Sequence, residues 1–531
     1  MYIRRVNRKN LDGSIVTYLQ LAENIWDSEK QRSKVRILCT LGRADQRADD
    51  RLKQLVRSIK KTTIPDLLDT GWSFQNSWEH GPLYVLEKMW ADLGIDKIIR
   101  DKAGELFERT IFLMVANRCL APQSKLGCYE RWLEEIYWRG PSMELQHLYR
   151  AMDFLHEHKE KIEESLYWRL ADLLSLDVDL VFYDTTSVHF EIEEEDEKLR
   201  KRGYSKNGRS DAPQMIVGMA VTRDGFPVKS WVFPGNTADV TTIERVKEDL
   251  KGWRLNRCIF VADAGMVSEE NLALLRRGGG RYIVAMPWRR GTDAAEAVSH
   301  PGRFQEVREN LQVKEVRVGG RRYVVCFNLK EAERQRLHRG EVLQELTEEL
   351  RSLREHPKRA CRLMVSRRFG RYLRRLKSGE LRLNQAAVQE QERHDGIWII
   401  HSNDDELSAE DMALAYKQLL RVEECWRTMK STIEIRPVFH RSSRRIRAHV
   451  FLCVLSLLLE RVAEKACGTT WFRIREELRS IKIGQLFGPK GTVYQVTPGT
   501  PEARNMLKKL NIDPLPSVLS VEQDLDTHRV S

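Results

Sequence analysis

The chain has 531 residues, 41% of them hydrophobic, and its 89 Lys and Arg exceed its 77 Asp and Glu, for a formal net charge of +12. This length predicts about three domains, and the basic balance suits a polyanionic partner. Nine cysteines without a CxxC pair argue against a zinc site or a disulfide framework. The segment MYIRRVNRKN does not read as a signal peptide, and no apolar run is long enough to span a bilayer. We therefore expect a cytoplasmic protein with no membrane partner.

The N-terminal part divides into two regions. Residues 1–75 begin with strand-like segments, which a charged helix follows, and residues 76–175 predict helices interrupted at Gly94 and Pro122. Short helices with such breaks could form a helix-turn-helix-like unit. A plain helical packing layer explains the same pattern equally well.

Residues 176–290 alternate strands with helices, which predicts an α/β fold. Two buried strands are each followed by an aspartate, Asp184 after VDLVFY and Asp263 after IFVA. A single aspartate at a strand end is more often a cap or turn residue. Two of them on neighbouring strands could bring their carboxylates together. We expect strands at 178–184, 214–222, 226–233, 257–263 and 281–287, and helices near 239–251 and 268–277.

Residues 291–395 interrupt this alternation with short strands and a long charged helix at 329–354, and we expect a β-rich insertion. Its segment KRACRLMVSRRFGRYLRRLK is dense in Arg and Lys with interleaved Tyr and Phe. This composition is typical of a surface that follows a nucleic-acid backbone. The alternative is a solvated face without a ligand.

Residues 409–433 predict one amphipathic helix. Tyr416, Glu423 and Lys430 are seven residues apart each time, so they return to nearly the same angle on a helix. A second stripe has the spacing of a face that packs on a core. The pattern indicates a carboxylate held at a cleft, although a solvated charged face would also explain it. The core stripe consists of Val422, Trp426, Met429 and Ile433.

Together these segments supply three carboxylates, on Asp184, Asp263 and Glu423. Clustered carboxylates repel one another and need cations, and hard oxygen ligands select Mg²⁺ or Mn²⁺. Two such ions on either side of a phosphodiester can activate a water or a 3′-hydroxyl and stabilise the leaving oxygen. The cluster therefore predicts phosphoryl transfer on nucleic acid.

The order Asp184, Asp263, Glu423 resembles that of the DDE transposases of bacterial insertion sequences. In one superfamily of these enzymes the third acid lies in Tyr-x2-Arg-x3-Glu-x6-Lys, and YKQLLRVEECWRTMK has the Tyr, Glu and Lys at this spacing. It departs from the pattern at Leu419, where Arg421 is the nearest basic residue. The segments GYSKNGRSDAPQMIVGMAVTRDGFPVKSWVFPGNTADV and EIRPVFHRSSRRIRAHV extend the resemblance over most of residues 175–465.

The resemblance implies an α/β protein with a ribonuclease-H-like catalytic core, a β-rich insertion and a helical N-terminal DNA-binding region. Arg118, Ser124 and Lys125 then become candidate phosphate contacts in that region. The expected organisation is a strand-containing region at 1–75, a helical DNA-binding region at 76–175, the core at 176–290 and 396–466, the insertion at 291–395 and a tail element at 467–531.

The resemblance also implies the activity, a transposase that binds insertion-sequence ends, cleaves DNA and joins the 3′ ends to target DNA by cut-and-paste. Asp184, Asp263 and Glu423 would be the catalytic residues and the ligands of two Mg²⁺ or Mn²⁺ ions. Trp398 would stack on a base flipped from the cleavage site, or else it is an ordinary buried strand residue. The expected DNA contacts are Tyr416, Arg421, Lys430, Trp398, Arg436 and Arg447.

The expected partners are double-stranded DNA, with terminal inverted repeats and a target site, and a second copy of the chain on that DNA in the bacterial nucleoid. Two other functions remain open. One is a metal-dependent nuclease of the same fold that cuts without joining. The other is a non-catalytic DNA-binding protein derived from a transposase.

Overall fold

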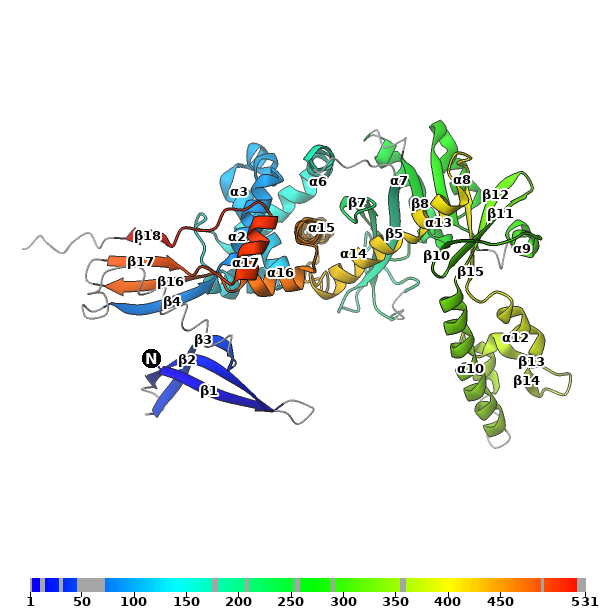
Figure 1. Ribbon diagram of the computed structural model, residues 1–531, viewed down its shortest axis with the longest axis horizontal. Coiled ribbons are helices and arrows are strands. Elements are labelled where there is room, and N and C mark those ends of the chain that lie inside the picture. The colour runs from blue at the N-terminus through cyan, green and yellow to red at the C-terminus, as the bar shows by residue number, and fades with distance from the viewer. Residues whose placement is uncertain are drawn as a thin grey trace, which may run out of the picture. The chain divides into compact units, whose positions relative to one another are not determined.

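The structure is a computed structural model, in which two compact units are described (Figure 1). One unit comprises residues 1–174 and 428–531, and the other comprises residues 175–427. No helix in the described parts of the chain is long and apolar enough to cross a bilayer. The described residues are 2–9, 15–27, 32–44, 72–173, 180–205, 209, 211–251, 253, 258–287, 292–353, 360–488 and 491–522.

The unit of residues 175–427 is built on one nine-stranded sheet with the order β10-β11-β12-β15-β9-β8-β5-β6-β7. The strands β5, β6 and β7 are successive antiparallel neighbours, whereas β5, β8 and β9 run parallel. Helices connect the parallel strands, as parallel pairing requires. The bounds are β5 Leu180–His189, β6 Gln214–Val221, β7 Pro227–Pro234, α7 Ile243–Lys251, β8 Ile259–Ala262, α8 Glu269–Arg276 and β9 Arg281–Ala285.

These elements agree with the strands and helices predicted for residues 176–290, except at Asp184. The apolar run predicts that the strand ends at this aspartate, but β5 continues five residues further, to His189. The reason is the partner strand β6, which pairs with β5 from Phe182 to His189. Antiparallel pairing satisfies the backbone beyond the apolar run, so the strand does not end where the hydrophobic signal ends.

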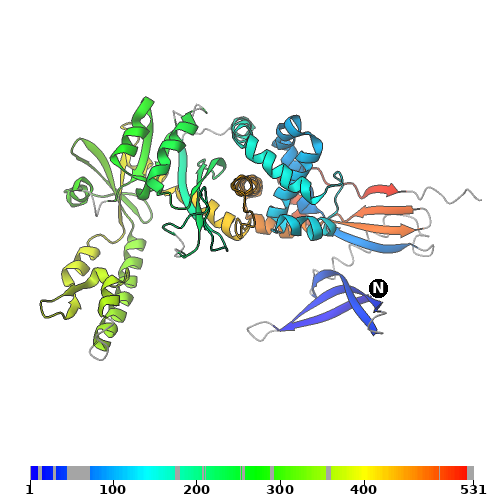
Figure 2. The same cartoon turned by 180° about the vertical axis from the view of Figure 1, so that it is seen from behind.

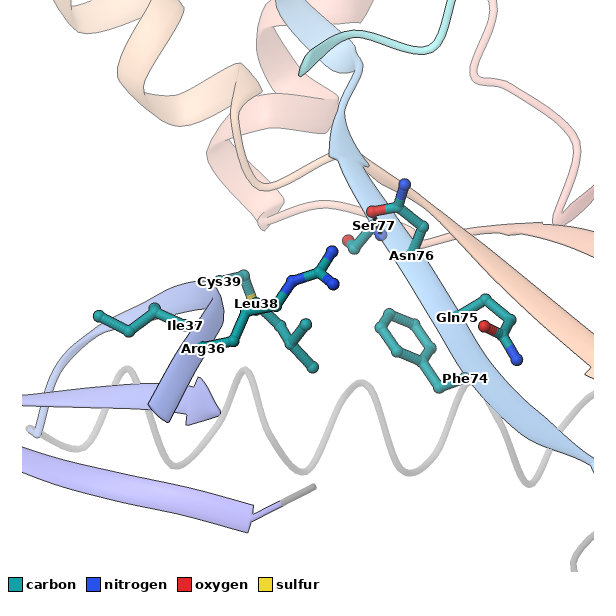
Figure 3. A pocket seen from close by; sticks show the side chains of 8 residues that line it. All are labelled: Arg36, Ile37, Leu38, Cys39, Phe74, Gln75, Asn76 and Ser77. Carbon is teal, nitrogen blue, oxygen red and sulfur yellow. Dashed lines mark hydrogen bonds between the residues drawn. The ribbon is translucent and has the colours of Figure 1, made fainter. Parts of the chain in front are cut away.

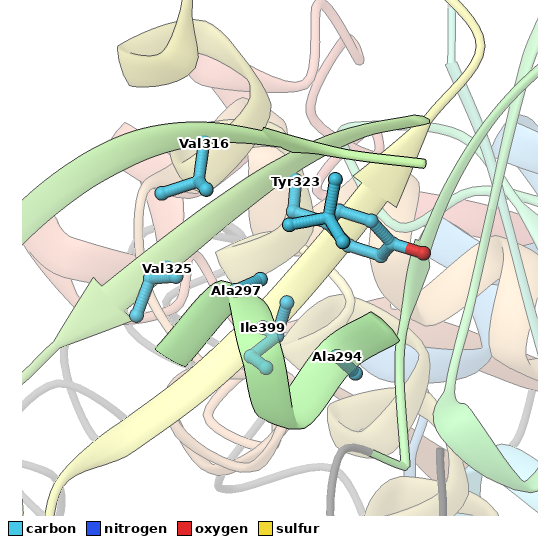
Figure 4. Packing of buried hydrophobic residues seen from close by; sticks show 7 residues of the cluster. Ala294, Ala297, Val316, Tyr323, Val325 and Ile399 are labelled. Carbon is cyan, nitrogen blue, oxygen red and sulfur yellow. The ribbon is translucent and has the colours of Figure 1, made fainter. Parts of the chain in front are cut away.

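The insertion is mixed rather than β-rich. Its strands β10 (Gln305–Arg308), β11 (Leu311–Val318) and β12 (Arg321–Phe327) extend the core sheet, and α9 (Thr292–Ser299) covers them. Ala294 and Ala297 of α9 belong to a buried hydrophobic cluster, which Figure 4 shows. The strand residues labelled in it are Val316, Tyr323, Val325 and Ile399. The rest is a lobe with its own core, formed by α10 (Leu329–Ser352), α11 (Ala360–Val365), β13 (Leu373–Arg375), β14 (Leu381–Leu383) and α12 (Gln385–Glu392).

The chain returns from the lobe through β15 (Ile397–Ser402), which pairs with both β12 and β9. Two helices then follow where the sequence predicts one: α13 (Ala409–Lys417) and α14 (Leu420–Ser431). The break lies at Gln418 and Leu419, whose amides bond three residues back instead of four. Leu419 is buried there, so a core contact interrupts a segment with good helix propensity.

The predicted core stripe on α14 is confirmed, because Val422, Trp426, Met429 and Ile433 are all buried.

The other unit contains the predicted helical region. Helices α2 (Gly81–Asp92), α3 (Ile95–Leu120) and α6 (Leu145–Leu173) pack with α15 (Ser443–Cys467), as Figures 1 and 2 show. The helix α15 is buried on nearly all sides from Ile446 to Glu460, which explains why its sequence lacks a polar stripe. Therefore residues 443–466, predicted as part of the catalytic core, pack instead among helices of the N-terminal half.

Residues 467–531 are predicted as a tail element, and their described parts contain regular secondary structure. They form α16 (Trp471–Leu478), β16 (Lys482–Gly488), β17 (Gly491–Val496), α17 (Pro501–Lys509) and β18 (Val518–Glu522). The strands make a sheet of order β18-β17-β16-β4, in which β4 is Ser73–Glu79. Pairing between segments about 400 residues apart, such as Ile483 with Trp78, has no local sequence signal.

The N-terminal strands β1 (Tyr2–Lys9), β2 (Ile15–Asp27) and β3 (Arg32–Arg43) form an antiparallel sheet, as the strand-like sequence predicts. The charged helix predicted after them lies outside the described residues. A cavity of about 130 Å³ is lined by residues 36–39 of β3 and 74–77 of β4 (Figure 3).

Candidate functional site

The central strands bring Asp184 and Asp263 to the same level of the sheet. Tyr183 of β5 is the register partner of Ala262 of β8, and each aspartate is the next residue along its chain. Neighbouring strands are about 4.8 Å apart, so the backbones of the two aspartates are adjacent. Asp184 is the one residue of β5 that is not fully buried, and Asp263 is exposed. Both carboxylates therefore reach solvent from a rigid, buried support.

Asp263 does not act as a helix cap, which was the alternative role for it. It occupies the N-cap position of the short 3₁₀ helix η5 (Ala264–Met266), but its side chain makes no capping hydrogen bond. Its Oδ1 instead accepts a hydrogen bond of 3.0 Å from the hydroxyl of Tyr416, in the last turn of α13. Burial, and then the negative charges of Asp263, Glu423 and Asp184, raise the pKa of the Tyr416 hydroxyl, so it stays protonated and remains a donor.

Tyr416 therefore lies within electrostatic reach of all three predicted acids. Glu423 reaches this region from the first turn of α14, where its side chain is exposed. Its neighbour Glu424 has a different role, because it forms an ion pair of 3.0 Å with Arg421. No group of three or more His, Cys, Asp or Glu side chains in the described part of the chain is arranged to hold a metal ion. The charges of all three acids nevertheless act on the same tyrosine hydroxyl.

A further carboxylate, which the sequence did not single out, lies beside this group. Asp239 begins the 3₁₀ helix η3 (Asp239–Thr242), and its Oδ1 accepts a hydrogen bond of 2.5 Å from the hydroxyl of Thr185. Its Oδ2 also lies near Gly265, two residues after Asp263. The available signal was its position in GNTADV, after the strand β7. From the sequence, that segment indicates only the start of a helix.

The predicted basic contacts have varied surroundings. Lys430 and Arg436 are half-buried, and Arg447 on α15 is also half-buried, with its pKa lowered by that burial. Arg421 is exposed on α14, and its guanidinium forms an ion pair with Glu424. Tyr416 belongs to α13 and not to the helix of Glu423 and Lys430, so the predicted stripe of three residues on one helix is wrong.

Trp398 is a residue of the sheet. It lies in β15 with Cys326 of β12 as its register partner, and its side chain is half-buried. The indole Nε1 is buried without a hydrogen-bond partner. This placement matches the alternative considered from the sequence, packing in the strand, and the stacking role stays a prediction.

Arg118 and Lys125, which were candidate phosphate contacts, are both buried, with 3% and 2% of their surfaces exposed. Arg118 donates to the carbonyl oxygens of Gln123 and Glu434, at 2.7 Å and 3.1 Å. Burial, followed by the nearby charge of Arg118, lowers the pKa of Lys125 to about 7. The hydroxyl of Ser124 caps the following short helix by accepting from the amide of Gly127. The side chains of Arg118 and Lys125 are thus enclosed in the protein interior, and Ser124 acts as a helix cap.

Two models of known protein families match separate regions of this chain. The family model described as "Transposase DDE domain" matches residues 179–459, more than half of the chain, and the model of the "IS1634 family transposase, N-terminal domain" matches residues 3–66. No curated protein matches. A solved structure of the piggyBac transposase synaptic complex with hairpin DNA is 10% identical, with a TM-score of 0.36, over 75% of this chain and 79% of that chain. A similarity this weak carries no argument about the site.

Proposed function

Because this chain belongs to the DDE transposase domain family, we propose that Asp184, Asp263 and Glu423 are its three catalytic acids. The protein is a DDE transposase, and the activity of this family depends on a divalent metal. The observation that carries the assignment is the placement of Asp184 and Asp263 at one level of adjacent parallel strands. The charge of Glu423 acts on the same hydroxyl that Asp263 binds.

The core is proposed to be ribonuclease-H-like. Support comes from the five strands β7-β6-β5-β8-β9, in which three consecutive antiparallel strands adjoin two parallel ones. The two aspartates lie at the centre of this arrangement. The strands β15, β12, β11 and β10 then extend the sheet beyond β9, so the insertion lies between the last core strand and the helix of Glu423.

The donor set fits the expected metal. All three acids supply carboxylate oxygens, the ligands that Mg²⁺ and Mn²⁺ prefer, and their side chains reach solvent. Asp184 and Asp263 would hold the metal, two ions in our proposal, and Glu423 would complete the site. The bound metal would activate the attacking oxygen and stabilise the leaving oxygen of a phosphodiester. Tyr416 would hold Asp263 in one orientation through its hydrogen bond.

We propose that the substrate is the double-stranded DNA of insertion-sequence ends, cut and then joined to target DNA by a homodimer in the bacterial nucleoid. Lys430, Arg436 and Arg447 would neutralise phosphates near the cut, because each is cationic and follows Glu423 closely in the chain. Arg421 would join them only after leaving Glu424. The basic lobe of the insertion, with exposed Arg374 and Arg375, would follow the DNA backbone.

The test is cleavage and joining of labelled element ends by the full chain with Mg²⁺. Asp184→Asn should abolish both reactions while DNA binding is retained, since the change removes one charge from a partly exposed side chain. The control is Asp405→Asn, because Asp405 is an exposed acid of the same unit that forms an ion pair with Arg317 at the surface. Cleavage without joining would identify a nuclease, and binding without cleavage would identify a non-catalytic derivative.

A further inference from the structure

We propose that the 3₁₀ turn η3, through Asp239, positions Asp184 and Asp263 relative to one another. This inference rests on the proposed function and deepens it, because it names the residues that hold two proposed metal ligands in place. Asp239 is a positioning residue and does not itself hold the metal. All the residues that take part belong to one compact unit.

The sheet alone does not fix the spacing of the two aspartates. The parallel pairing of β5 with β8 ends at Tyr183 and Ala262. Each aspartate is the next residue, so neither is included in this pairing. Asp184 still has a partner in Met219 of β6, but Asp263 lies beyond the last residue of β8. Two carboxylates at neighbouring positions repel one another, so the end of β8 needs a further restraint to stay beside β5.

Two hydrogen bonds join β5 to η3. Side chains alternate along a strand, so the two neighbours of Asp184 point to the face opposite to its carboxylate. On that face the hydroxyl of Thr185 donates to Asp239 Oδ1 at 2.5 Å. The hydroxyl of Tyr183 donates to Thr242 Oγ1 at 3.0 Å, and Thr242 donates in turn to the carbonyl oxygen of Asp239 at 2.7 Å. One short turn therefore holds the strand on both sides of Asp184.

The same turn is joined to the segment that follows Asp263. The side-chain amide of Asn271, on α8, donates to the carbonyl oxygen of Val240 in η3 at 2.7 Å and to that of Met266 in η5 at 2.8 Å. The amide of Met266 donates to the carbonyl oxygen of Asp263 at 3.1 Å. Asn271 is buried, so these bonds are protected from water. A continuous set of hydrogen bonds thus links the backbones of the two aspartates through η3.

The network is built for rigidity. The side chains of Tyr183, Thr185 and Thr242 are fully buried, so water does not compete for their hydroxyl groups. A hydrogen bond to a carboxylate is also stronger than one between neutral groups. Asp239 does not use its side chain to cap its own turn, whose N-cap position belongs to Ala238. Its carboxylate serves the neighbouring strand instead.

The experiment measures Mn²⁺ binding to the full chain by isothermal titration calorimetry, together with single-turnover cleavage over a range of Mg²⁺ concentrations. Thr185→Val keeps the shape of the side chain and removes the donor to Asp239. It should weaken Mn²⁺ binding by about 10-fold to 100-fold, the range for a group that supports a metal ligand. The Mg²⁺ concentration for half-maximal cleavage should rise by the same factor, and the rate at saturating Mg²⁺ should fall much less. Thr185→Ser keeps the hydroxyl and should recover most of the affinity.

Asp239 provides a second pair of variants, on a side chain that is only half-buried. Asp239→Ala removes the acceptor and should weaken Mn²⁺ binding as Thr185→Val does. Asp239→Asn keeps an acceptor oxygen for Thr185, so it should recover most of the affinity that the alanine variant loses. A metal ligand would behave differently. If Asp239→Asn abolished Mn²⁺ binding as Asp184→Asn should, Asp239 would be a ligand and the inference would be overturned.

Thr110→Val is the matched control. Thr110 is also fully buried, and its hydroxyl donates to the carbonyl oxygen of Leu106 at 2.6 Å, but it belongs to the other compact unit. This variant should bind Mn²⁺ as the wild type does. The inference fails if Thr185→Val or Asp239→Ala lowers the melting temperature and leaves Mn²⁺ affinity unchanged. A wild-type chain that neither binds Mn²⁺ nor cleaves DNA would overturn the proposed function instead.

Discussion

Tyr416 and Asp263 are joined by a hydrogen bond of 3.0 Å, although they are 153 residues apart in the chain. The bond occupies one oxygen of a proposed metal ligand and links α13 to the end of β8. It also connects the two parts of the sequence that the insertion separates. The position of the aspartate carboxylate thus depends on the helix that precedes α14.

We predict that Tyr416→Phe slows cleavage of labelled DNA ends by about 10-fold to 100-fold, the range for a hydrogen bond to a charged group. The substitution keeps the ring and removes only the donor. Single-turnover cleavage at several Mg²⁺ concentrations measures the effect, and the melting temperature reports the fold. A rate equal to that of the wild type at every Mg²⁺ concentration would show that the hydroxyl has no positioning role.

Glu423 and Glu424 provide a paired test of the third acid. Glu423→Gln should abolish cleavage, because it removes a charge proposed to complete the metal site. Glu424→Gln should leave the cleavage rate nearly unchanged, because Glu424 is engaged by Arg421 at the surface and such pairs contribute little. Both variants should bind DNA. The opposite result would place the catalytic acid one residue further along α14.

Lys430→Ala should reduce end joining far more than it reduces stability. Lysine is a suitable point charge for a phosphate near the cut, and Lys430 is only half-buried on α14. Strand-transfer assays and thermal unfolding measure the two effects, with Lys417→Ala on α13 as a control. A large drop in melting temperature with normal joining would identify Lys430 as a structural residue.

The buried Lys125 predicts a pH dependence of stability. Its pKa is lowered to about 7 in the folded protein from an ordinary value of 10.5. Between these values the unfolded chain binds more protons than the folded chain, so this group makes the free energy of unfolding rise as pH increases above about 7. Below pH 7 the contribution is constant. Lys125→Met should remove this rise, which denaturant unfolding of both proteins at pH 7 and pH 9 would measure. If the free energy of unfolding changed equally between pH 7 and pH 9 in both proteins, Lys125 would not be the source of the pH dependence.

The basic lobe predicts a salt effect. Replacing Arg374, Arg375 and Lys377 together by alanine should reduce the slope of log affinity for duplex DNA against log salt, by about 0.9 for each phosphate that these side chains neutralise. The three side chains are exposed, so folding of the lobe should be unaffected. An unchanged slope would mean that DNA does not contact this part of the lobe.

The strands of residues 180–285 could be predicted because each one contains a short run rich in apolar residues, although the end of β5 could not. The break at Gln418 and Leu419 could not, since the helical periodicity continues through it and only the burial of Leu419 interrupts the helix. The same holds for the sheet formed by β4 with β16, β17 and β18, whose pairing joins distant segments. Local patterns identify elements, but their partners depend on contacts that no local pattern contains.

In the candidate site, too, some residues could be predicted from the sequence and others could not. Asp184 and Asp263 could be located because each follows a short apolar run, and their common level in the sheet follows from parallel pairing of β5 with β8. Asp239 could not be recognised, because its link to the site is a hydrogen bond from Thr185, a residue buried inside a strand. The structural roles of Arg118 and Lys125 were also hidden, since charged residues are rarely buried and are assigned by default to the surface.

The helical lobe of the insertion begins and ends at a single point of the sheet. Phe327, the last residue of β12, pairs with Ile397, the first of β15, and the amide of Asn328 donates to the carbonyl oxygen of Gly396 at 2.9 Å. Residues 328–396 thus occupy the place of an ordinary hairpin turn. Such a junction lets the lobe be exchanged for a lobe of another size, or for a short turn, while the ladder on both sides keeps its register. The size of this lobe can therefore change without altering the register of the sheet that carries Asp184 and Asp263.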